Sequence, residues 1–250
     1  AAARRRARPD AASEIATVTV SFPANSAVTL DGVDDYVDIP AAGLSPALDI
    51  AGDLTLEAWF MTPVSLTAQT DFAAIAQRVR TSGVNDDSYG IVVGDGEYIR
   101  FLIGNDTAEE SVDTVGFTAA VDTWYHVAGV FDVSVPELRI YINGVFNNSA
   151  PVSIAPTAAD GPLQFGHTSY PGTPVYFAGD IDDVRVWSVA RTQEQLTNAA
   201  SKTLLGSEVG LAGYWNFDDA TAADVTGGSA PGTLANGAMT TPSLLTLDTN

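Results

Sequence analysis

Short segments in which hydrophobic and polar residues alternate recur along most of the chain. In LRIYI, for example, Leu138, Ile140 and Ile142 are separated by Arg139 and Tyr141. Successive residues of a strand point to opposite faces, so this alternation predicts half-buried β-strands. The predicted strands cover residues 14–22, 26–32, 35–40, 53–61, 71–79, 88–94, 97–104, 123–132, 137–146, 162–166 and 177–187.

The connections between these segments predict how the strands are joined. Asp-Gly at 95–96 and Asn-Gly at 143–144 are typical of tight hairpin turns. Many short strands with such turns predict an all-β fold, a two-sheet antiparallel jelly-roll sandwich rather than βαβ units. Thr192 and Gln195 form a capping box, which predicts one short helix on the C-terminal side over residues 193–205.

The pattern divides the chain into three parts. Residues 1–25 form an Arg-rich arm with an extra strand, 26–220 the jelly-roll domain, and 221–250 a Gly/Ala/Thr-rich extension with one edge strand. The start lacks Met and an apolar signal core, which indicates a processed product or a fragment of a longer precursor. The strand at 14–22 either completes its own sheet or adds to the edge of a neighbouring copy.

The net charge of the chain limits the classes of molecule that it can bind. The 250 residues include 31 acidic and 11 basic side chains, for a net charge of −20. Such a field repels nucleic acid and attracts divalent cations and basic partners. No run of about 18 or more apolar residues exists, so we expect no membrane span. The arm is either a solvated tail or an assembly element that docks onto acidic copies of the chain through its arginines, Arg4, Arg5, Arg6 and Arg8.

Several longer motifs follow one another in a recognisable order. They are VTLDGVDDYVDIP, LTLEAWF, WYHVAGVFD, LRIYINGVF, FAGDIDDVRVWSVARTQEQL and GLAGYWNFDD, with VTGGSAPGTLANGA behind them. In this combination the sequence resembles the LamG-like jelly-roll family, within the concanavalin A-like lectin/glucanase fold, over roughly residues 26–236. The resemblance implies a secreted two-sheet jelly roll that often binds calcium and usually serves as an adhesive or glycan-binding accessory.

Two motifs begin with a carboxylate that precedes a row of core residues. Asp35 and Asp182 each stand two residues before alternating Val or Ile positions, and neighbouring strands would bring them to one rim. A calcium ion, which takes about six to eight oxygens, would satisfy them there. The resemblance also places a calcium ligand at Asp182. The predicted Ca²⁺ ligands are Asp35, Asp182 and the carbonyls around Gly32 and Asp34.

A second interpretation of these carboxylates needs no metal. Aspartates commonly accept backbone N–H groups in tight turns, and these could instead pair with Arg185 and Arg191. The side chains of Asp34 and Asp183 have the opposite parity to Asp35 and Asp182, so we expect them at the surface or in turns.

The sequence offers little for catalysis. Glycoside hydrolysis needs two carboxyl groups about 5–9.5 Å apart, and no E-x-D-x-E-like run supplies a pair on one strand face. Glu57 has no second carboxylate beside it in its strand, so it does not form such a pair. His126 is expected to be a packed and hydrogen-bonded side chain rather than a ligand. With no cysteine and two histidines, a zinc or thiolate site is not supported. No phosphate-binding Gly-rich loop opens a helix, so nucleotide binding has no support.

Glycan binding would need exposed aromatic rings beside polar planar groups. The candidates in loops are Tyr89 near Asn85, and His167 with Tyr170 and Tyr176. The four tryptophans lie within strand patterns and are expected in the core.

Together these features predict an extracellular, non-enzymatic module with a structural calcium site. In one form it recognises a polysaccharide or glycoprotein surface through loops at the rim of the sandwich. In the other it is a structural subunit of an extracellular filament or surface layer, assembled through the N-terminal arm and strand. A glycoside hydrolase, or its accessory carbohydrate-binding module, is the third possibility.

Overall fold

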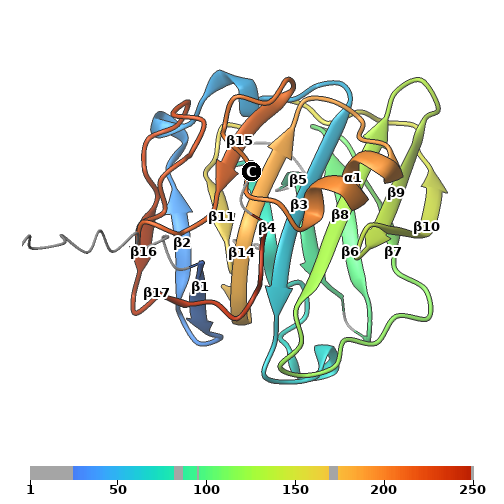
Figure 1. Ribbon diagram of the computed structural model, residues 1–250. Coiled ribbons are helices and arrows are strands. Elements are labelled where there is room, and N and C mark those ends of the chain that lie inside the picture. The colour runs from blue at the N-terminus through green and yellow to red at the C-terminus, as the bar shows by residue number, and fades with distance from the viewer. Residues whose placement is uncertain (1–24, 82–86, 95, 169–173, 249–250) are drawn as a thin grey trace, which may run out of the picture.

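Two antiparallel β-sheets lie face to face and form a sandwich (Figure 1). The computed structural model describes residues 25–81, 87–94, 96–168 and 174–248. Strands far apart in the sequence are neighbours, since β1 pairs with both β14 and β17. The predicted all-β two-sheet jelly roll is confirmed.

Sheet A has eight strands among the described residues, in the order β10-β9-β8-β3-β14-β1-β17, with β15 also paired to β14. Their bounds are β1 Ser26–Asp31, β3 Leu54–Met61, β8 Tyr125–Asp132, β9 Glu137–Ile142, β10 Val145–Pro151, β14 Ala178–Trp187, β15 Leu211–Trp215 and β17 Met239–Pro242.

Sheet B has seven strands within the same ranges, in the order β16-β2-β11-β4-β5-β6-β7. A short hairpin of two further strands packs against β4. The bounds are β2 Tyr36–Ile39, β4 Ala74–Val79, β5 Asp87–Val93, β6 Ile99–Gly104, β7 Glu109–Asp113, β11 Leu163–Phe165 and β16 Thr233–Ala235, with β12 His167–Thr168 and β13 Val175–Tyr176 in the hairpin.

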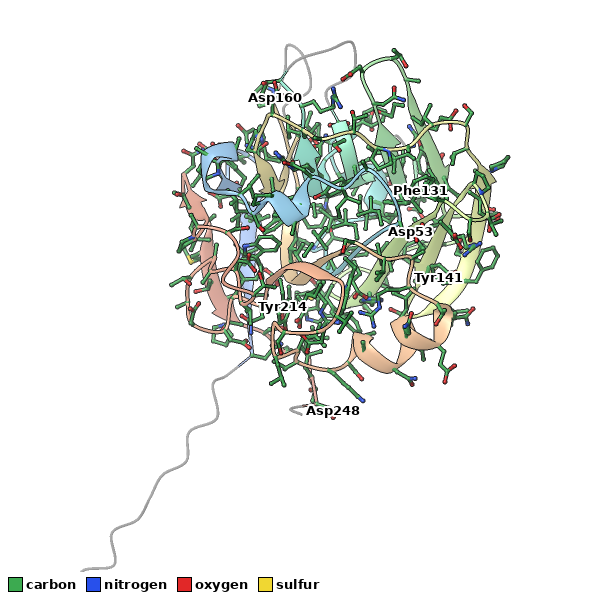
Figure 2. All side chains as sticks on the ribbon, turned by 90° about the horizontal axis from the view of Figure 1, so that it is seen from above. Asp53, Phe131, Tyr141, Asp160, Tyr214 and Asp248 are labelled. Carbon is green, nitrogen blue, oxygen red and sulfur yellow. The ribbon has the colours of Figure 1, made fainter. Side chains whose placement is uncertain are left out.

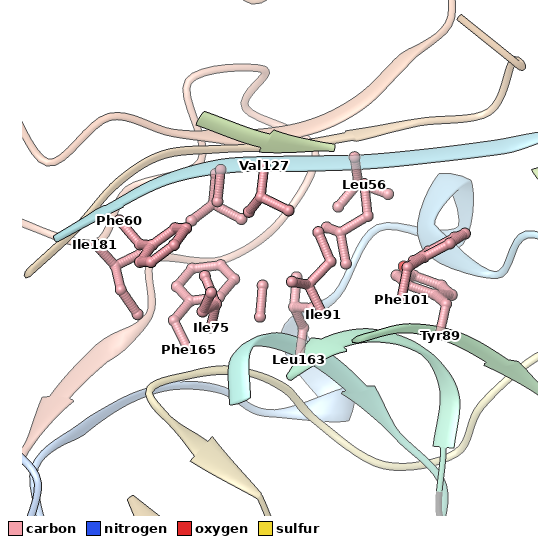
Figure 3. Packing of buried hydrophobic residues seen from close by; sticks show 14 of the residues in the cluster. Leu56, Phe60, Ile75, Tyr89, Ile91, Phe101, Val127, Leu163, Phe165 and Ile181 are labelled. Atoms are coloured by element: carbon pink, nitrogen blue, oxygen red, sulfur yellow. The ribbon is translucent and has the colours of Figure 1, made fainter. Parts of the chain in front are cut away.

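The hydrophobic core lies between the two sheets. In β3, Leu56 and Phe60 point inward and are fully buried, while alternate residues point to the outer face. Figure 3 shows these side chains of sheet A facing Ile75 and Phe165 of sheet B. Burial of such rows removes apolar area from water at about 25 cal/mol per Å², which is the main favourable contribution to this fold.

One helix, α1 (Gln193–Ala200), covers the outer face of sheet A in front of β3 and β8 (Figure 1). The predicted capping box is present, with Thr192 and Gln195 each satisfying the other's backbone N–H. The helix ends at Ala200, five residues before the predicted end, where Trp59 Nε1 donates to the Ala200 carbonyl at 2.7 Å. Short 3₁₀ helices occupy Ala41–Gly43, Pro46–Leu48 and Leu66–Ala68.

A layer of buried charge lies between sheet A and α1. Glu57 is fully buried and accepts from His126 Nε2 at 3.0 Å, Trp187 Nε1 at 2.7 Å and Arg191 Nη1 at 3.2 Å. Arg185 donates to the Ala199 carbonyl at 2.9 Å, at the end of α1. His126 is therefore packed and hydrogen-bonded, as its sequence context predicts.

Asp183 departs from its predicted position at the surface. It is 1% exposed, lies 3.1 Å from Arg185 Nη2 and accepts from the Tyr214 hydroxyl. Figure 2 shows Tyr214 on the side of the sandwich that carries α1. The cause is a register shift in β14 between Asp182 and Arg185, with Asp183 at φ 48°. A bulge of this kind breaks the two-residue parity on which the prediction relied.

The C-terminal segment contributes more structure than the sequence predicts. Residues 221–250, expected as an extension with one edge strand, supply β16 to sheet B and β17 to sheet A. The strands β7, β12, β13 and β15 were also not predicted. The Asn-Gly turn at 143–144 is confirmed, with φ values of 52° and 73°. The predicted strand at 14–22 and the arginines of the arm lie outside the described residues.

Candidate functional site

Three aromatic rings gather on the outer side of sheet B. Val37 and Ile39 point into the core, so Tyr36 and Asp38 of β2 point outward. His167 of β12 lies between two tyrosines, with its ring centroid 4.8 Å from that of Tyr36 and 4.9 Å from that of Tyr176. The two tyrosine rings, 6.2 Å apart, are half-buried and so keep part of their surface in solvent. We call this group, with Asp38 and Gln164, the Tyr36 site.

A chain of hydrogen bonds fixes the polar groups of the Tyr36 site. Gln164 Nε2 donates to Asp38 Oδ1 at 2.8 Å, so the Gln164 Oε1 atom faces His167 Nδ1 at 3.0 Å. That oxygen can only accept, so Nδ1 carries the proton and Nε2 of the neutral ring is left as an acceptor. Burial lowers the pKa of His167, and the nearby charge of Asp38 opposes that shift.

The arrangement suits a ligand with both an apolar face and hydroxyl groups. The half-buried rings offer surface for stacking, and the Asp38 carboxylate is a charged acceptor for a hydroxyl donor. Two of the predicted binding residues, His167 and Tyr176, are brought together here. Tyr36 was not singled out in the sequence, although its parity opposite to Val37 and Ile39 could have placed it on an outward face.

The other predicted binding residues do not join this site. Tyr89 was expected in an exposed loop, but it is fully buried in the core of β5 and its hydroxyl donates to the Leu48 carbonyl at 3.0 Å. Its parity with Ile91 and Val93 explains the burial. Burial also raises the pKa of Tyr89. Asn85 and Tyr170 lie outside the described residues.

The carboxylates around Asp35 form a cluster in the turn before β2. One oxygen each of Asp31, Asp34 and Asp35 lies within 4.8 Å of the others. Asp31 Oδ1 accepts from the Val33 N–H at 2.8 Å, and Asp35 Oδ2 accepts from the Asp31 N–H at 3.2 Å. The Asp34 carbonyl, a predicted ligand, already accepts from Asn236 Nδ2. Backbone groups of the turn therefore satisfy much of this cluster without a cation.

A different set of oxygens surrounds Asp182. Asp182 is fully buried, and its Oδ2 accepts from Asn25 Nδ2 at 3.1 Å. The same Asn25 nitrogen donates to the Leu245 carbonyl at 2.9 Å. Burial, together with the charges of Asp183 and Asp218, raises the pKa of Asp182 well above its ordinary value. Burial also raises the pKa of Asp218 to about 6.

The structure separates the two predicted calcium carboxylates. Asp31, which contacts Asp35, pairs with Ala178 on β14, and Asp182 lies four residues further along that strand. At about 3.3 Å per residue the separation along the strand is roughly 13 Å. Asp182 pairs with Trp59 and so points to the outer face of sheet A, because the bulge in β14 reverses its parity relative to Val184. Asp35 and Asp182 thus do not share one rim.

The buried carboxylate of Asp182 and the half-buried one of Asp218 are a second candidate for a cation, although both also accept hydrogen bonds from protein N–H groups. Among the described residues neither side chain forms an ion pair, whereas Asp183 beside them is neutralised by Arg185. A buried and a half-buried carboxylate that lack a counter-charge are costly. Rotation of the Asn25 amide group would turn its oxygen, in place of its nitrogen, towards a cation. Asn25 joins the Asp182 carboxylate to the Leu245 carbonyl, and the charge of Asp218 acts on Asp182; oxygen atoms of these kinds are the ligands that calcium prefers.

Comparison with protein-family models identifies the family to which the chain belongs. The family model Laminin_G_3, described as the concanavalin A-like lectin/glucanases superfamily, matches residues 31–197. The chain belongs to this superfamily. The match covers the strands β2 to β14, which include the Tyr36 site, and α1 as far as Thr197. Among curated proteins, none matches the chain.

Solved structures share the fold. A candidate carbohydrate binding protein from Bacteroides ovatus is 24% identical with a TM-score of 0.68 over 90% of this chain, which spans 60% of that protein's length. A heptameric SAP-like pentraxin from Limulus polyphemus is 13% identical with a TM-score of 0.61, over 90% of this chain and 98% of that one.

A third solved structure is a carbohydrate-binding domain. The CBM40 domain of a Ruminococcus gnavus sialidase, bound to α2,3-sialyllactose, is 12% identical with a TM-score of 0.51. The alignment covers 68% of this chain and 95% of that domain. In the part of the chain that the structure describes, no helix is both long and apolar enough to cross a membrane.

Proposed function

We propose that this superfamily member is a carbohydrate-binding module that holds its ligand at the Tyr36 site. The observation that carries the proposal is the set of tilted rings of Tyr36, His167 and Tyr176 beside the Asp38 carboxylate. Sugar rings present C–H faces that stack on aromatic side chains and hydroxyls that bond to carboxylates. Two fold neighbours, one a candidate carbohydrate binding protein and one bound to sialyllactose, support the proposal.

Binding rather than catalysis fits the carboxylates of this chain. Glu57, the isolated carboxylate of β3, is fully buried and accepts hydrogen bonds from three donors. A carboxylate that is buried and hydrogen-bonded in this way cannot reach the glycosidic oxygen of a substrate. We also propose that the module works outside the cell, on polysaccharide or glycoprotein surfaces, where such ligands are displayed.

Three variants of the full chain test the binding site. Tyr36→Ala removes a stacking ring and is expected to abolish retention on the glycan that the wild-type chain binds in an array or pull-down. Tyr36→Phe keeps the ring and is expected to retain most of that binding. Phe146→Ala, in the edge strand β10, alters an aromatic residue that is 47% exposed and is the matched control. Equal binding by the wild type and Tyr36→Ala would place the ligand elsewhere.

We further propose that calcium is bound by Asp182, Asp218, Asn25 and the Leu245 carbonyl, where it would tie the start of β1 to β14. Bound calcium would supply the positive charge that the buried Asp182 and the half-buried Asp218 otherwise lack. We expect calcium to raise the melting temperature of the wild type and to have no effect on Asp182→Asn or Asp218→Asn. Asp35→Asn is the control, because it alters the other acidic cluster. Loss of the calcium effect in Asp35→Asn alone would assign the ion to that turn.

Self-association is the alternative function that the sequence predicts. It would use the arginines of the arm and the strand at 14–22, and the acidic composition of the chain supplies a surface for them. Light scattering after size exclusion, comparing the full chain with one lacking residues 1–24, tests it. Large species that disappear with the truncation would support assembly, and a monomer in both would refute it.

A further inference from the structure

The described arginines are already neutralised. Each of them forms an ion pair with an Asp or Glu side chain. The pairs are Arg78–Asp49, Arg80–Asp106, Arg100–Asp113, Arg139–Asp132, Arg139–Glu137, Arg185–Asp183 and Arg191–Glu57. An anionic ligand would have to compete with one of these carboxylates for its guanidinium group.

The single lysine of the chain is not close to the Tyr36 site. Lys202 follows α1, and its backbone carbonyl accepts from Arg185 Nη2 at 2.6 Å on the outer side of sheet A. The Tyr36 site lies on the outer side of sheet B, so the whole sandwich separates the two. No described cation is thus available to a ligand at the rings.

The polar atoms of the site favour hydroxyl donors. Asp38 is a carboxylate and can only accept, and the hydrogen bond from His167 Nδ1 to Gln164 leaves Nε2 of that ring as a second acceptor. A carboxylate or sulfate group is itself an acceptor, and near Asp38 it would meet a like charge. A sugar hydroxyl, in contrast, can donate to either atom.

We propose that the Tyr36 site is selective for neutral glycans and rejects sialylated, sulfated and uronic-acid-containing ones. This inference rests on the proposed function and specifies its ligand class. It separates the chain from the fold neighbour bound to sialyllactose, whose ligand is acidic. The net charge of −20 acts in the same direction, because it repels polyanionic polysaccharides before contact.

The test uses pairs of oligosaccharides that share a backbone and differ only in charge. Neutral members and their sulfated or uronic-acid counterparts are printed on one array and probed with the full chain, in calcium and again in chelator. The quantity scored is the binding that Tyr36→Ala abolishes, so that any retention of polyanions by the arginines of the arm is not counted. Asp38→Asn, which replaces an acceptor-only group by an amide with donor hydrogens, is measured in parallel.

The outcomes distinguish the inference from the function on which it rests. We expect Tyr36-dependent binding to neutral glycans only, weakened about tenfold or more by Asp38→Asn, because a hydrogen bond to a charged group is lost. Tyr36-dependent binding that is as tight or tighter for the acidic counterparts would overturn the selectivity and leave carbohydrate binding standing. If no glycan of either class shows Tyr36-dependent binding, the proposed function fails and the inference with it.

Discussion

Replacement of Glu57 by Gln tests whether the buried charge layer stabilises the sandwich. The substitution keeps the shape of the side chain but removes the charge that balances Arg191 and bonds to His126 and Trp187. Breaking a buried ion pair by removing one partner typically costs about 3–5 kcal/mol. At about 2–4 °C per kcal/mol for a chain of this size, the melting temperature should fall by roughly 6–20 °C.

The pKa of Glu57 reflects the same interactions. Burial alone would raise this pKa, but the hydrogen bond with His126 and the charges of Arg185 and Arg191 lower it from 4.5 to about 2. At 1.36 kcal/mol per pKa unit, that difference corresponds to about 3 kcal/mol. A carboxyl group whose pKa is lower in the folded state than in the unfolded state stabilises the folded state at pH values above its unfolded pKa. This stabilisation is present above about pH 4.5 and is lost as the pH falls towards 2.

The assay is equilibrium unfolding in urea, followed by circular dichroism at several pH values. The wild type should lose more of its free energy of unfolding between pH 5 and 2.5 than Glu57→Gln does. The control is Glu137→Gln in β9, whose carboxylate pairs with Arg139 where both side chains are partly exposed and should contribute less than about 1 kcal/mol. If the two variants are equally stable, the reasoning about the buried layer is wrong.

Three further predictions concern other parts of the molecule. In chelator, the melting temperature should fall as the pH rises from about 4 to 7. The reason is that the pKa values of Asp182 and Asp218 are raised by folding, so the folded state binds protons more tightly than the unfolded state. Excess calcium should reverse this trend. Trp59→Phe removes the donor to the end of α1 and should cost about 1 kcal/mol in urea unfolding. Gly129→Ala places a Cβ 2.1 Å from the Phe101 ring and should lower the melting temperature by several degrees, at about 1–3 kcal/mol for overpacking.

The local pattern predicts the longer strands and the start of the helix because each of these elements has a periodicity or a capping motif of its own. The alternation in β3, the Asn-Gly turn at 143–144 and the Thr192 capping box depend on residues within a few positions of one another. The same alternation contains the information that Tyr36 points outward and Tyr89 inward. The predictions place the Val and Ile positions of these strands in the core, but they put Tyr89 in a loop and leave Tyr36 out.

The site around Asp182 could not be predicted in the same way. Its partners Asn25, Asp218 and Leu245 come from distant parts of the sequence, and only the strand register brings them together. The bulge in β14 also reverses the side to which Asp182 points, and a bulge leaves no clear mark in hydrophobic alternation. The resemblance to the family identified Asp182 as a candidate but not the side chains that surround it.

The positions of β16 and β17 have a consequence for how the protein folds as it is made. These late strands pair with β2 and β1, which a ribosome synthesises some 200 residues earlier. Until they emerge, both early strands are sheet edges with unpaired backbone groups, which are open to association with other chains. Closing contacts of such long sequence separation slows folding. A nascent chain of this module therefore stays vulnerable to aggregation until almost all of it has been synthesised.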